Sequence, residues 1–332
     1  MTLHRNTLGR GALRVTEFAF GAAGIGNLFT PVTDAAAEEA VHAAWDAGMR
    51  YFDTAPHYGL GLSERRLGAA LRSRPRSEYL LSTKVGRILE PTPGATGADL
   101  AQGFAVPATH RRRWDFTASG VRRSIEASLE RLGLDRIDIV YLHDPDDHAA
   151  EALGQAYPEL ARMRDEGTVG AIGAGMNQAR LLARFVRETD IDAVLLAGRY
   201  TLLDQGGLAE LLPLAADRGV GVVIGGVFNS GLLADPRPGA SFDYAAAPPG
   251  PLARALDLRT VCERHGVPLR AAALRFPAAH PAVASVLIGL RSAAEAHDAA
   301  AMLDHPVPDA LWAELKGRGL LPADAPTPGA VG

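Results

Sequence analysis

Short apolar runs alternate with longer amphipathic segments along most of this chain. The apolar runs contain few polar positions, which is typical of parallel strands that are buried on both faces. They cover residues 18–20, 49–55, 79–85, 137–144, 169–175, 192–200, 219–226 and 285–290. Between them, apolar residues recur every three to four positions, as they do on surface helices. These helical segments cover residues 35–46, 63–71, 117–132, 151–166, 178–188, 207–218, 251–265 and 292–303.

The repetition of strand and helix predicts the fold class. In the segment 117–132, the residues on one helical face are apolar, and Gly133 supplies a typical helix end; the face consists of Val121, Ile125, Leu129 and Leu132. About eight strand–helix units of similar length match a (β/α)8 TIM barrel. A doubly wound sheet is the alternative fold, but it rarely needs so many equal units. We find no linker and no repeat, so we expect one domain over residues 1–332.

Three segments depart from this repetition. Residues 7–17 have hairpin character, and we expect them to plug the bottom of the barrel. Residues 86–115 form a long Pro- and Gly-rich insertion after the third strand, and barrel active sites lie on that side of the strands. We therefore expect the insertion to lie over the site, with its basic run 110–113 as a solvated loop. The Pro- and Ala-rich tail, residues 321–332, is expected to be loose.

Composition excludes several classes of protein. With 34 basic and 38 acidic side chains in 332 residues, the net charge of −4 gives no attraction to nucleic acid or to anionic membranes. Cys262 is the only cysteine, which excludes an intrachain disulfide and a cysteine zinc site. The first residues resemble no signal peptide, and no apolar run is long enough to cross a membrane. We expect a cytoplasmic protein with a small-molecule substrate, and predict no oligomeric state.

Three ionisable residues close three consecutive predicted strands. Asp53 closes the second strand, Lys84 the third and His143 the fourth, while Tyr58 follows Asp53 in the next loop. A lysine at the end of an apolar strand is costly to bury without a partner, and Asp53 is the natural one. An ammonium near a phenol favours the phenolate and so lowers the pKa of the tyrosine. Tyr58 could then move a proton, and His143 could hydrogen-bond the same substrate oxygen.

A second interpretation of these residues is purely structural. Asp53 and Lys84 would form an ion pair that only stabilises the barrel, and Tyr58 would be a loop aromatic. The spacing of Asp53, Tyr58 and Lys84 in the sequence favours neither interpretation over the other. The barrel-top loop around His143 also gathers acidic residues and a second histidine, namely Asp144, Asp146, Asp147 and His148. We interpret it as a polar loop, because His143 belongs to the proton-transfer group and no metal-ligand set is left.

Ordered motifs through nearly the whole chain resemble those of the aldo-keto reductases. The segments FDTAPHYG, STKVG and YLHD follow one another at the spacing of that family. They are joined by the glycine-rich first strand and by GAGMN, AGRYTLLDQ, FNSGLLA and IGLRSAAE. The resemblance implies a barrel that transfers hydride between an alcohol or carbonyl and NAD or NADP. It also implies a catalytic tetrad with Tyr58 as general acid and base; its members are Asp53, Tyr58, Lys84 and His143.

The resemblance further implies a set of cofactor contacts. It assigns Gly21, Ala22, Asp53, Asn177, Phe228, Asn229, Ser230, Gly231, Leu232, Gly289, Arg291 and Glu295. Glu295 stands where NADP-using members commonly have arginine, so we expect NAD to be preferred over NADP. The chain departs from the family where a Ser-Asn pair and a Gln usually hold the nicotinamide amide. Gly175-Met176 and Ala197 occupy those places, which leaves Asn177 as the substitute.

Two further departures concern aromatic and glycine residues. Gly225 or Gly226 replaces a tyrosine that stacks on the nicotinamide in many members, and Phe228 is a candidate to cover that face. The segment GAAGIG looks like half of a dinucleotide fingerprint but lacks the acidic partner, so we interpret its glycines as allowing close backbone approach. In the insertion, Trp114 is a candidate to line the substrate pocket, together with Tyr58 and His143.

Within the family, the resemblance is strongest to the branch of D-threo-aldose (L-fucose) 1-dehydrogenases and pyridoxal 4-dehydrogenases. The marks of this branch are the long insertion and the stretch SLERLGLDRIDIVYLHDPDDH. It implies oxidation of the anomeric hydroxyl of an aldose to the lactone. The alternatives are oxidation of the hemiacetal of pyridoxal and a general aldehyde or ketone reductase. A non-enzyme alternative is a cofactor-binding regulatory subunit of the channel-β type, against which the intact tetrad argues.

Overall fold

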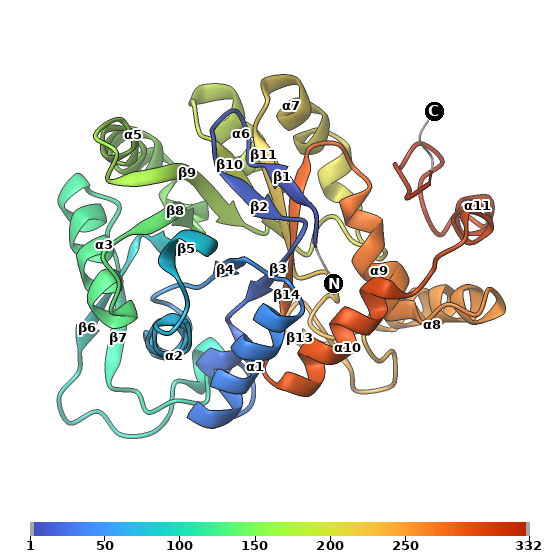
Figure 1. Ribbon diagram of the computed structural model, residues 1–332, viewed down its shortest axis with the longest axis horizontal. Coiled ribbons are helices and arrows are strands. Elements are labelled where there is room, and N and C mark those ends of the chain that lie inside the picture. The colour runs from blue at the N-terminus through green and yellow to red at the C-terminus, as the bar shows by residue number, and fades with distance from the viewer. Residues whose placement is uncertain (1–2, 330–332) are drawn as a thin grey trace.

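The computed structural model describes residues 3–329 and contains a closed barrel of eight parallel strands. Around the barrel the strands follow the order β3, β4, β5, β8, β9, β10, β11 and β14, which returns to β3 (Figure 1). Their bounds are β3 Phe18–Gly21, β4 Tyr51–Asp53, β5 Leu80–Val85, β8 Ile137–His143, β9 Val169–Met176, β10 Ala193–Ala197, β11 Gly221–Gly225 and β14 Val283–Gly289. The predicted barrel and its strand order are therefore confirmed.

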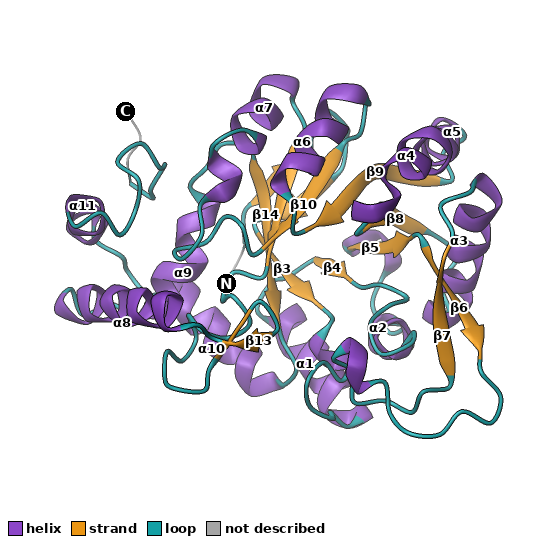
Figure 2. Ribbon diagram, turned by 180° about the vertical axis from the view of Figure 1, so that it is seen from behind, coloured by secondary structure: helices purple, strands orange, loops and turns teal. Residues whose placement is uncertain are grey.

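The helices pack around the outside of the barrel (Figure 2). Their bounds are α1 Asp34–Asp46, α2 Leu62–Leu71, α3 Ala118–Leu132, α4 Ala149–Glu151, α5 Tyr157–Asp165, α6 Ala179–Glu188, α7 Leu211–Arg218, α8 Pro249–Arg264, α9 Leu269–Ala278, α10 Ala293–Asp304 and α11 Asp309–Gly317. The ends follow the local chemistry that the sequence suggested: Thr117 caps the start of α3, and Gly133 adopts a left-handed conformation at its end. A π-helical turn, Ala152–Ala156, joins α4 to α5. None of these helices is long and apolar enough to cross a membrane.

Two helices were not predicted from the sequence. The strands β11 and β14 are linked by α8 and then α9, and α11 follows α10 near the C-terminus. In α9 the sequence LRAAALRFPA buries seven residues, so it lacks the alternation of buried and exposed positions that marks a surface helix. In the tail, which we expect to be loose, Leu321 and Ala325 are buried in the main core, whereas Ala323, Asp324 and Gly329 are exposed. Residues 330–332 lie outside the described part.

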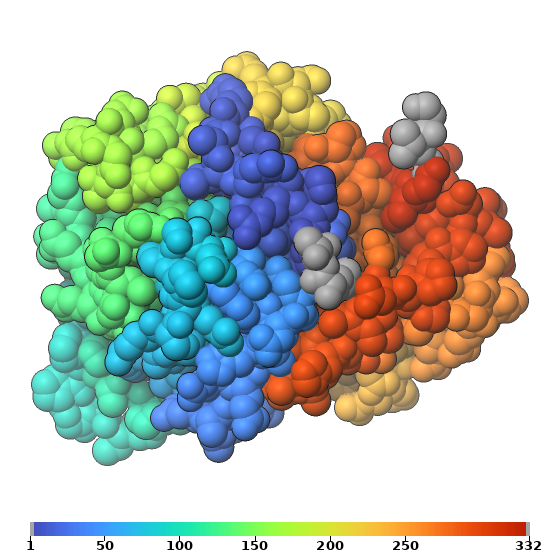
Figure 3. Space-filling view, in the orientation of Figure 1, coloured from blue at the N-terminus to red at the C-terminus, as the bar shows by residue number. Residues whose placement is uncertain are grey.

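The N-terminal hairpin closes the bottom of the barrel, as predicted. It consists of β1, Arg5–Thr7, and β2, Arg14–Thr16, which pair in an antiparallel register. Leu8 at its turn is fully buried and belongs to the cluster of side chains that fills the barrel interior. Figure 3 shows these N-terminal residues, in dark blue, filling the middle of the visible face. The open end of the barrel, where the strands terminate, is therefore the opposite one.

The insertion of residues 86–115 is a folded ribbon rather than a loop. It contains two antiparallel strands outside the barrel, β6 (Arg87–Pro91) and β7 (His110–Trp114) (Figure 2). The basic run 110–113, which we had expected to be a solvated loop, is strand β7. The prediction failed because three arginines in a row give no apolar alternation. The run instead pairs in register with β6, which lies earlier in the insertion. A further pair of two-residue strands, β12 (Ser241–Phe242) and β13 (Ala245–Ala246), follows β11.

Candidate active site

A buried ion pair links the ends of two neighbouring barrel strands. Lys84 Nζ on β5 lies 2.7 Å from Asp53 Oδ2 on β4 and also donates to the carbonyl of Thr54 at 2.9 Å. The side chains are only 2% and 4% exposed, respectively. A charge so deeply buried is tolerable only with a partner, and removing one member of such a pair costs about 3–5 kcal/mol. The pairing that the sequence predicted for Asp53 and Lys84 is therefore present.

A chain of hydroxyl groups continues from this pair into the barrel interior. Ser82 Oγ donates to Asp53 Oδ1 at 2.6 Å, and the Tyr51 hydroxyl lies 3.0 Å from Ser82 Oγ. The Tyr141 hydroxyl is 3.2 Å from that of Tyr51. Burial raises the pKa of both tyrosines, so both hydroxyls stay protonated. Sequence reasoning missed this chain, although Tyr51, Ser82 and Tyr141 carry hydroxyl groups within largely apolar strands.

The loop that carries Tyr58 is pressed against the glycine-rich segment after β3. A Cβ built on Gly59, whose φ is +61°, would lie 2.2 Å from the carbonyl oxygen of Gly26. A Cβ on Gly26 would lie 3.0 Å from the carbonyl group of Tyr58. The first position therefore needs glycine, and a side chain at the second would crowd the backbone of Tyr58. The glycines of GAAGIG allow close backbone approach, as the sequence suggested, and this contact holds Tyr58 at the open end of the barrel.

Tyr58 lies beside the ion pair, with Lys84 Nζ 4.8 Å from the centre of its ring. Burial is the main influence on its pKa, which is raised to about 12 even though the charge of Lys84 opposes the rise. Our expectation that Lys84 would leave the phenol with a lowered pKa is thus corrected: Lys84 acts in the predicted direction, but burial outweighs it. At neutral pH Tyr58 is therefore a proton donor, and it becomes a base only in alkaline solution or as substrate binding changes its surroundings.

His143, at the end of β8, completes the group of four. Its ring lies edge-on to Tyr58, with ring centres 5.9 Å apart. Burial and the nearby cations Arg87 and Lys84 lower its pKa well below the ordinary value, so the imidazole is neutral. Its Nε2 is 3.5 Å from a carboxylate oxygen of Asp144, which is held by Arg87 at 2.6 Å. The structure thus brings the four predicted catalytic residues together at the open end of the barrel.

The insertion covers this group from one side, as predicted. Phe104 packs against the rings of His57 and Tyr58, with ring centres 5.2 and 6.2 Å away. Arg112 on β7 donates to the carbonyl of His57 at 2.9 Å and pairs with Asp99 at 2.6 Å. The side of the ribbon that faces the barrel thus supplies one apolar ring and one firmly paired cation.

The contacts of the Trp114 ring are with Phe116, His148 and Arg87. Its ring stacks on Phe116, and the guanidinium carbon of Arg87 lies 4.4 Å from the ring centre. The residue is 41% exposed. It is not among the residues that line the main cavity. Contact between Trp114 and a substrate stays a prediction.

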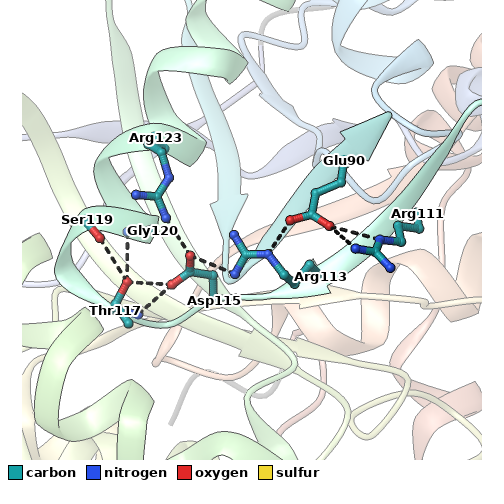
Figure 4. Close-up of polar contacts among 8 residues, drawn as sticks. All are labelled: Glu90, Arg111, Arg113, Asp115, Thr117, Ser119, Gly120 and Arg123. Atoms are coloured by element: carbon teal, nitrogen blue, oxygen red, sulfur yellow. Dashed lines mark hydrogen bonds and ion pairs between the residues drawn. The ribbon is translucent and has the colours of Figure 1, made fainter. Parts of the chain in front are cut away.

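Ion pairs tie the ribbon to the start of α3 (Figure 4). Glu90 on β6 binds Arg111, directly opposite on β7, and Arg113, which lies diagonally across the ribbon. Arg113 and Arg123 both reach Asp115, whose other oxygen accepts from the hydroxyl of Thr117 at 2.5 Å. Asp115 is 8% exposed and joins β7 directly to the helix cap at Thr117. The C-terminal end of the insertion is therefore anchored to the start of α3.

A cavity of about 560 Å³ extends from this group of residues along the ends of the strands. At one end it is lined by Asp53 and Tyr58, and at the other by residues of α9 and α10. The predicted cofactor residues that line it are Gly21, Ala22, Asp53, Asn177, Phe228, Asn229, Ser230, Gly231, Gly289, Arg291 and Glu295. Leu232 is the exception, because its side chain is fully buried in the main core. An elongated cavity of this kind fits a dinucleotide laid across the strand ends.

The cavity wall reflects the departures from the family pattern. Asn177 lines the cavity, whereas Gly175 and Met176 do not. Gly225 and Gly226 line it as well, next to Phe228. The structure is therefore consistent with Asn177 as the substitute amide and with Phe228 beside the glycines.

Asn229 is an exception among the predicted contacts, because its side chain is already occupied. Its amide donates to the carbonyl of Gly198 at 3.1 Å and accepts from Thr201 Oγ1 at 2.7 Å. Its backbone N–H also donates to the carbonyl of Gly226 at 2.9 Å, so Asn229 stabilises the cavity wall through its own hydrogen bonds.

The far end of the cavity contains two ion pairs. Glu295 accepts from the backbone N–H of Arg291 at 2.9 Å and lies 3.3 Å from its guanidinium. Arg270 on α9 binds Asp298 on α10 through two hydrogen bonds of 2.8 and 2.9 Å. Sequence reasoning missed Arg270 and Asp298 because it did not predict α9. Their spacing of 28 residues left no local pattern to detect.

Known proteins share much of this sequence. The model of the Aldo/keto reductase family matches residues 17–318. A D-threo-aldose 1-dehydrogenase from Pseudomonas sp is 47% identical over 93% of this chain and 96% of its own length. A pyridoxal 4-dehydrogenase from Microbacterium luteolum is 40% identical over 96% and 98%. An L-galactose dehydrogenase from Arabidopsis thaliana is 31% identical over 88% and 85%.

Solved structures share the fold. The holo form of an aldo-keto reductase from Bacillus halodurans matches with a TM-score of 0.73 and 23% identity, covering 95% of this chain and 96% of that one. A glycerol dehydrogenase from Gluconobacter oxydans matches with a TM-score of 0.72 and 21% identity, covering 97% of each chain. At this level of identity, the two structures support the architecture alone.

Proposed function

Because this chain belongs to the aldo/keto reductase family and is an NAD(P)-dependent oxidoreductase, we propose that it oxidises the anomeric hydroxyl of a free aldose to the lactone. The observation that carries the proposal is the 47% identity to a D-threo-aldose 1-dehydrogenase over 93% of the chain. The four ionisable residues at the open end of the barrel provide the acid–base chemistry that such an oxidation needs.

The residues of the cavity suit a nicotinamide dinucleotide. Asp53, Tyr58 and Asn177 would surround the reactive end, and Arg270, Arg291 and Glu295 the adenosine end. Once bound, the nicotinamide ring accepts the hydride that leaves the anomeric carbon. Gly225, Gly226 and residues 229–231 also line the cavity.

Tyr58 moves the proton in the proposed reaction. As the anomeric C–H bond breaks, the O–H proton of the substrate passes to the phenol oxygen and the carbonyl of the lactone forms. The phenol must be ionised to accept it, and its raised pKa of about 12 makes this form scarce at neutral pH. Lys84 favours the phenolate and Asp53 holds Lys84 in place. Oxidation should therefore accelerate as the pH rises.

His143 has a positioning part in this scheme. Its neutral ring lies edge-on to Tyr58 and can hydrogen-bond the reacting oxygen without adding a charge to the site. This contact would hold the substrate oxygen against the phenol, which is what a general acid–base step requires.

For the cofactor, we propose that NAD is preferred over NADP. Glu295 already binds the guanidinium and the backbone N–H of Arg291, the nearest cation to a 2′-phosphate at that end. A phosphate would have to displace this carboxylate, whereas a ribose 2′-hydroxyl can donate a hydrogen bond to it. The preference for NAD therefore follows because the Glu295 carboxylate would repel the 2′-phosphate of NADP and would accept a hydrogen bond from the 2′-hydroxyl of NAD.

Pyridoxal is the second candidate substrate, because a pyridoxal 4-dehydrogenase is 40% identical over 96% of the chain. Its cyclic hemiacetal, like an aldose, presents a ring oxygen beside the reacting carbon. The same proton transfer through Tyr58 would give the corresponding lactone.

A substrate panel read by NADH absorbance tests the proposal. Free aldoses of the D-threo type, pyridoxal and simple aldehydes would each be assayed with NAD and with NADP. The proposal expects the highest kcat/KM for an aldose with NAD, and lactone as the product by NMR. A higher kcat/KM for pyridoxal would favour the second candidate, and turnover of simple aldehydes alone would contradict both.

A further inference from the structure

The ring of His57 lies beside Tyr58 and His143 but has no part in the tetrad. It precedes Tyr58, is partly buried, and has ring centres of Phe104, His143 and Tyr58 within 5.2, 5.6 and 6.1 Å. Its carbonyl is held by Arg112, so the backbone under the ring is fixed. A substrate whose reacting carbon rests against Tyr58 therefore brings its neighbouring groups to His57.

Within residues 3–329, His57 is the exception among the buried and partly buried histidines. Each of the others has a hydrogen bond or an ion pair to a protein group; they are His42, His110, His143, His148, His265, His280 and His305. The imidazole of His57 has none, and its Nδ1 is enclosed without a partner. Buried polar groups are nearly always paired in folded proteins, so such an atom calls for an explanation.

The enclosed nitrogen determines which nitrogen is free to donate. A buried N–H without an acceptor is especially unfavourable, so the proton belongs on Nε2, which is not enclosed. The ring is also uncharged, because burial together with Arg87 and Arg112 lowers the pKa of His57 to about 2. His57 thus has one N–H donor, on the nitrogen that is not enclosed, at any physiological pH.

The charges around the site are balanced. Lys84 is 2.7 Å from Asp53, Arg87 is 2.6 Å from Asp144, and Arg112 is 2.6 Å from Asp99. Each cation beside His57 and Tyr58 therefore already has a carboxylate partner. A substrate bearing a phosphate or carboxylate would have to break one of these pairs, whereas a neutral polyol would break none.

We propose that His57 is a further substrate-binding residue, whose Nε2–H donates a hydrogen bond to a ring hydroxyl of an uncharged, polyhydroxylated substrate. The inference rests on the proposed oxidation of free aldoses and adds to it the residue that recognises a hydroxyl away from the reacting carbon. Sites that hydrogen-bond a hydroxyl reject analogues that lack it, so His57 would contribute to substrate choice.

The test pairs enzyme variants with substrate analogues. Wild type and His57→Phe would be assayed with the best aldose and with its monodeoxy analogues, with kcat and KM determined separately. For the wild type, one deoxy analogue should have a kcat/KM lower by about tenfold to a hundredfold, the effect of one lost hydrogen bond. His57→Phe should lower kcat/KM for the parent sugar by a similar factor and no longer distinguish it from that analogue.

Conservative variants separate recognition from structure. In His57→Gln the amide nitrogen takes the place of Nε2, so part of the discrimination should return; in His57→Asn it takes the place of Nδ1, and discrimination should stay lost. His42→Phe is a matched control, because His42 is also partly buried but bonds the carbonyl of Ala70. It should leave the discrimination unchanged. NADH fluorescence and thermal unfolding would verify that each variant binds cofactor and folds.

Two different results would overturn two different claims. If His57→Phe lowers kcat/KM equally for the parent aldose and every deoxy analogue, His57 is a structural residue and only this inference fails. If the wild type oxidises pyridoxal or simple alcohols but no aldose, the proposed function fails, and this inference with it.

Discussion

Two groups of charged residues meet at the open end of the barrel, and they are built differently. Asp53 and Lys84 lie on adjacent barrel strands, are almost fully buried and have their polar atoms satisfied by Ser82 and Thr54. The ribbon of residues 86–115 instead contains exposed pairs, in which Glu90 binds Arg111 and Arg113, which are 71% and 42% exposed. It also has less exposed pairs, such as that of Arg112 with Asp99. Exposed pairs such as those of Glu90 are worth about 0–1 kcal/mol each, whereas breaking a buried pair costs about 3–5 kcal/mol.

Because the two groups are held differently, we expect them to have different functions: the barrel residues carry the proton transfer, and the ribbon contributes to substrate binding. The residues proposed to move the proton are fixed by the barrel, which a small change in a loop does not disturb. The residues that cover them come from a ribbon joined to the barrel mainly by polar contacts, apart from Phe104 and its apolar neighbours. Such a ribbon can vary in sequence while the strand ends beneath it stay the same. We therefore expect substitutions in the first group to alter kcat and changes in the ribbon to alter KM.

The largest effect is expected for Tyr58→Phe. This change removes only the hydroxyl assigned to proton transfer, so kcat for aldose oxidation should fall by about 10²- to 10⁴-fold. Cofactor binding, followed by NADH fluorescence, should be nearly unchanged. A variant that retains near wild-type kcat would show that Tyr58 is not the acid–base residue. The claim that the buried barrel residues carry the proton transfer would then be wrong.

Lys84→Met is expected to have the next largest effect. The ammonium lowers the pKa of Tyr58, so its loss should raise that pKa further. Because oxidation needs the phenolate, kcat at a fixed pH should fall by about tenfold or more, and the rise of kcat with pH should move to higher pH. Full activity with an unchanged pH profile would return Lys84 to a structural role.

The control for Lys84→Met concerns stability. The variant leaves Asp53 as an unpaired buried carboxylate, which should lower the free energy of unfolding by about 3–5 kcal/mol. Adding Asp53→Asn removes that charge, so the double variant should regain stability but not activity. Urea unfolding of both variants distinguishes the loss of the fold from the loss of the phenolate.

Glu295→Arg tests the exposed pair at the far end of the cavity. The change frees Arg291 and adds a second cation, so kcat/KM with NADP should improve relative to NAD by about tenfold to a hundredfold, or 1–3 kcal/mol. Both cofactors would be compared at saturating sugar. A wild type that prefers NADP, or a variant without any gain, would mean that Glu295 does not set the preference.

The smallest effect on the chemistry is expected from shortening the ribbon tip. Replacing residues 92–109 by a short turn between Pro91 and His110 keeps β6, β7 and the anchor at Asp115. It removes Phe104 from His57 and Tyr58, so KM should rise by about tenfold with little change in kcat. Collapse of the fold, seen as a lost thermal transition, would show that the tip belongs to the core.

The sequence predicted the parts of the fold that depend on local periodicity. The barrel strands were found because their residues are buried on both faces, and α3 because one face repeats. The ribbon and α9 were missed for opposite reasons: β7 contains three successive arginines and no alternation of apolar and polar residues, and α9 is apolar on nearly every side. Neither shows its period, and both are decided by residues far away in the chain.

The candidate site was predictable to a similar extent. Asp53, Lys84 and His143 close neighbouring strands, so their convergence follows from the barrel. The pKa of Tyr58 was not predictable, because it depends on how much protein encloses the phenol, and the packing of Phe104 onto it is not visible in the sequence. The hydroxyl chain below Asp53 likewise needs the register between β4, β5 and β8.

The most direct test of this separation compares Tyr58→Phe and the shortened ribbon on one aldose, with initial rates of NADH formation over a full range of sugar concentration. The account predicts that Tyr58→Phe loses kcat by at least about a hundredfold with KM little changed, and that the shortened ribbon raises KM with kcat nearly retained. A shortened ribbon that loses kcat as severely as Tyr58→Phe would contradict it, because the ribbon would then be part of the chemistry.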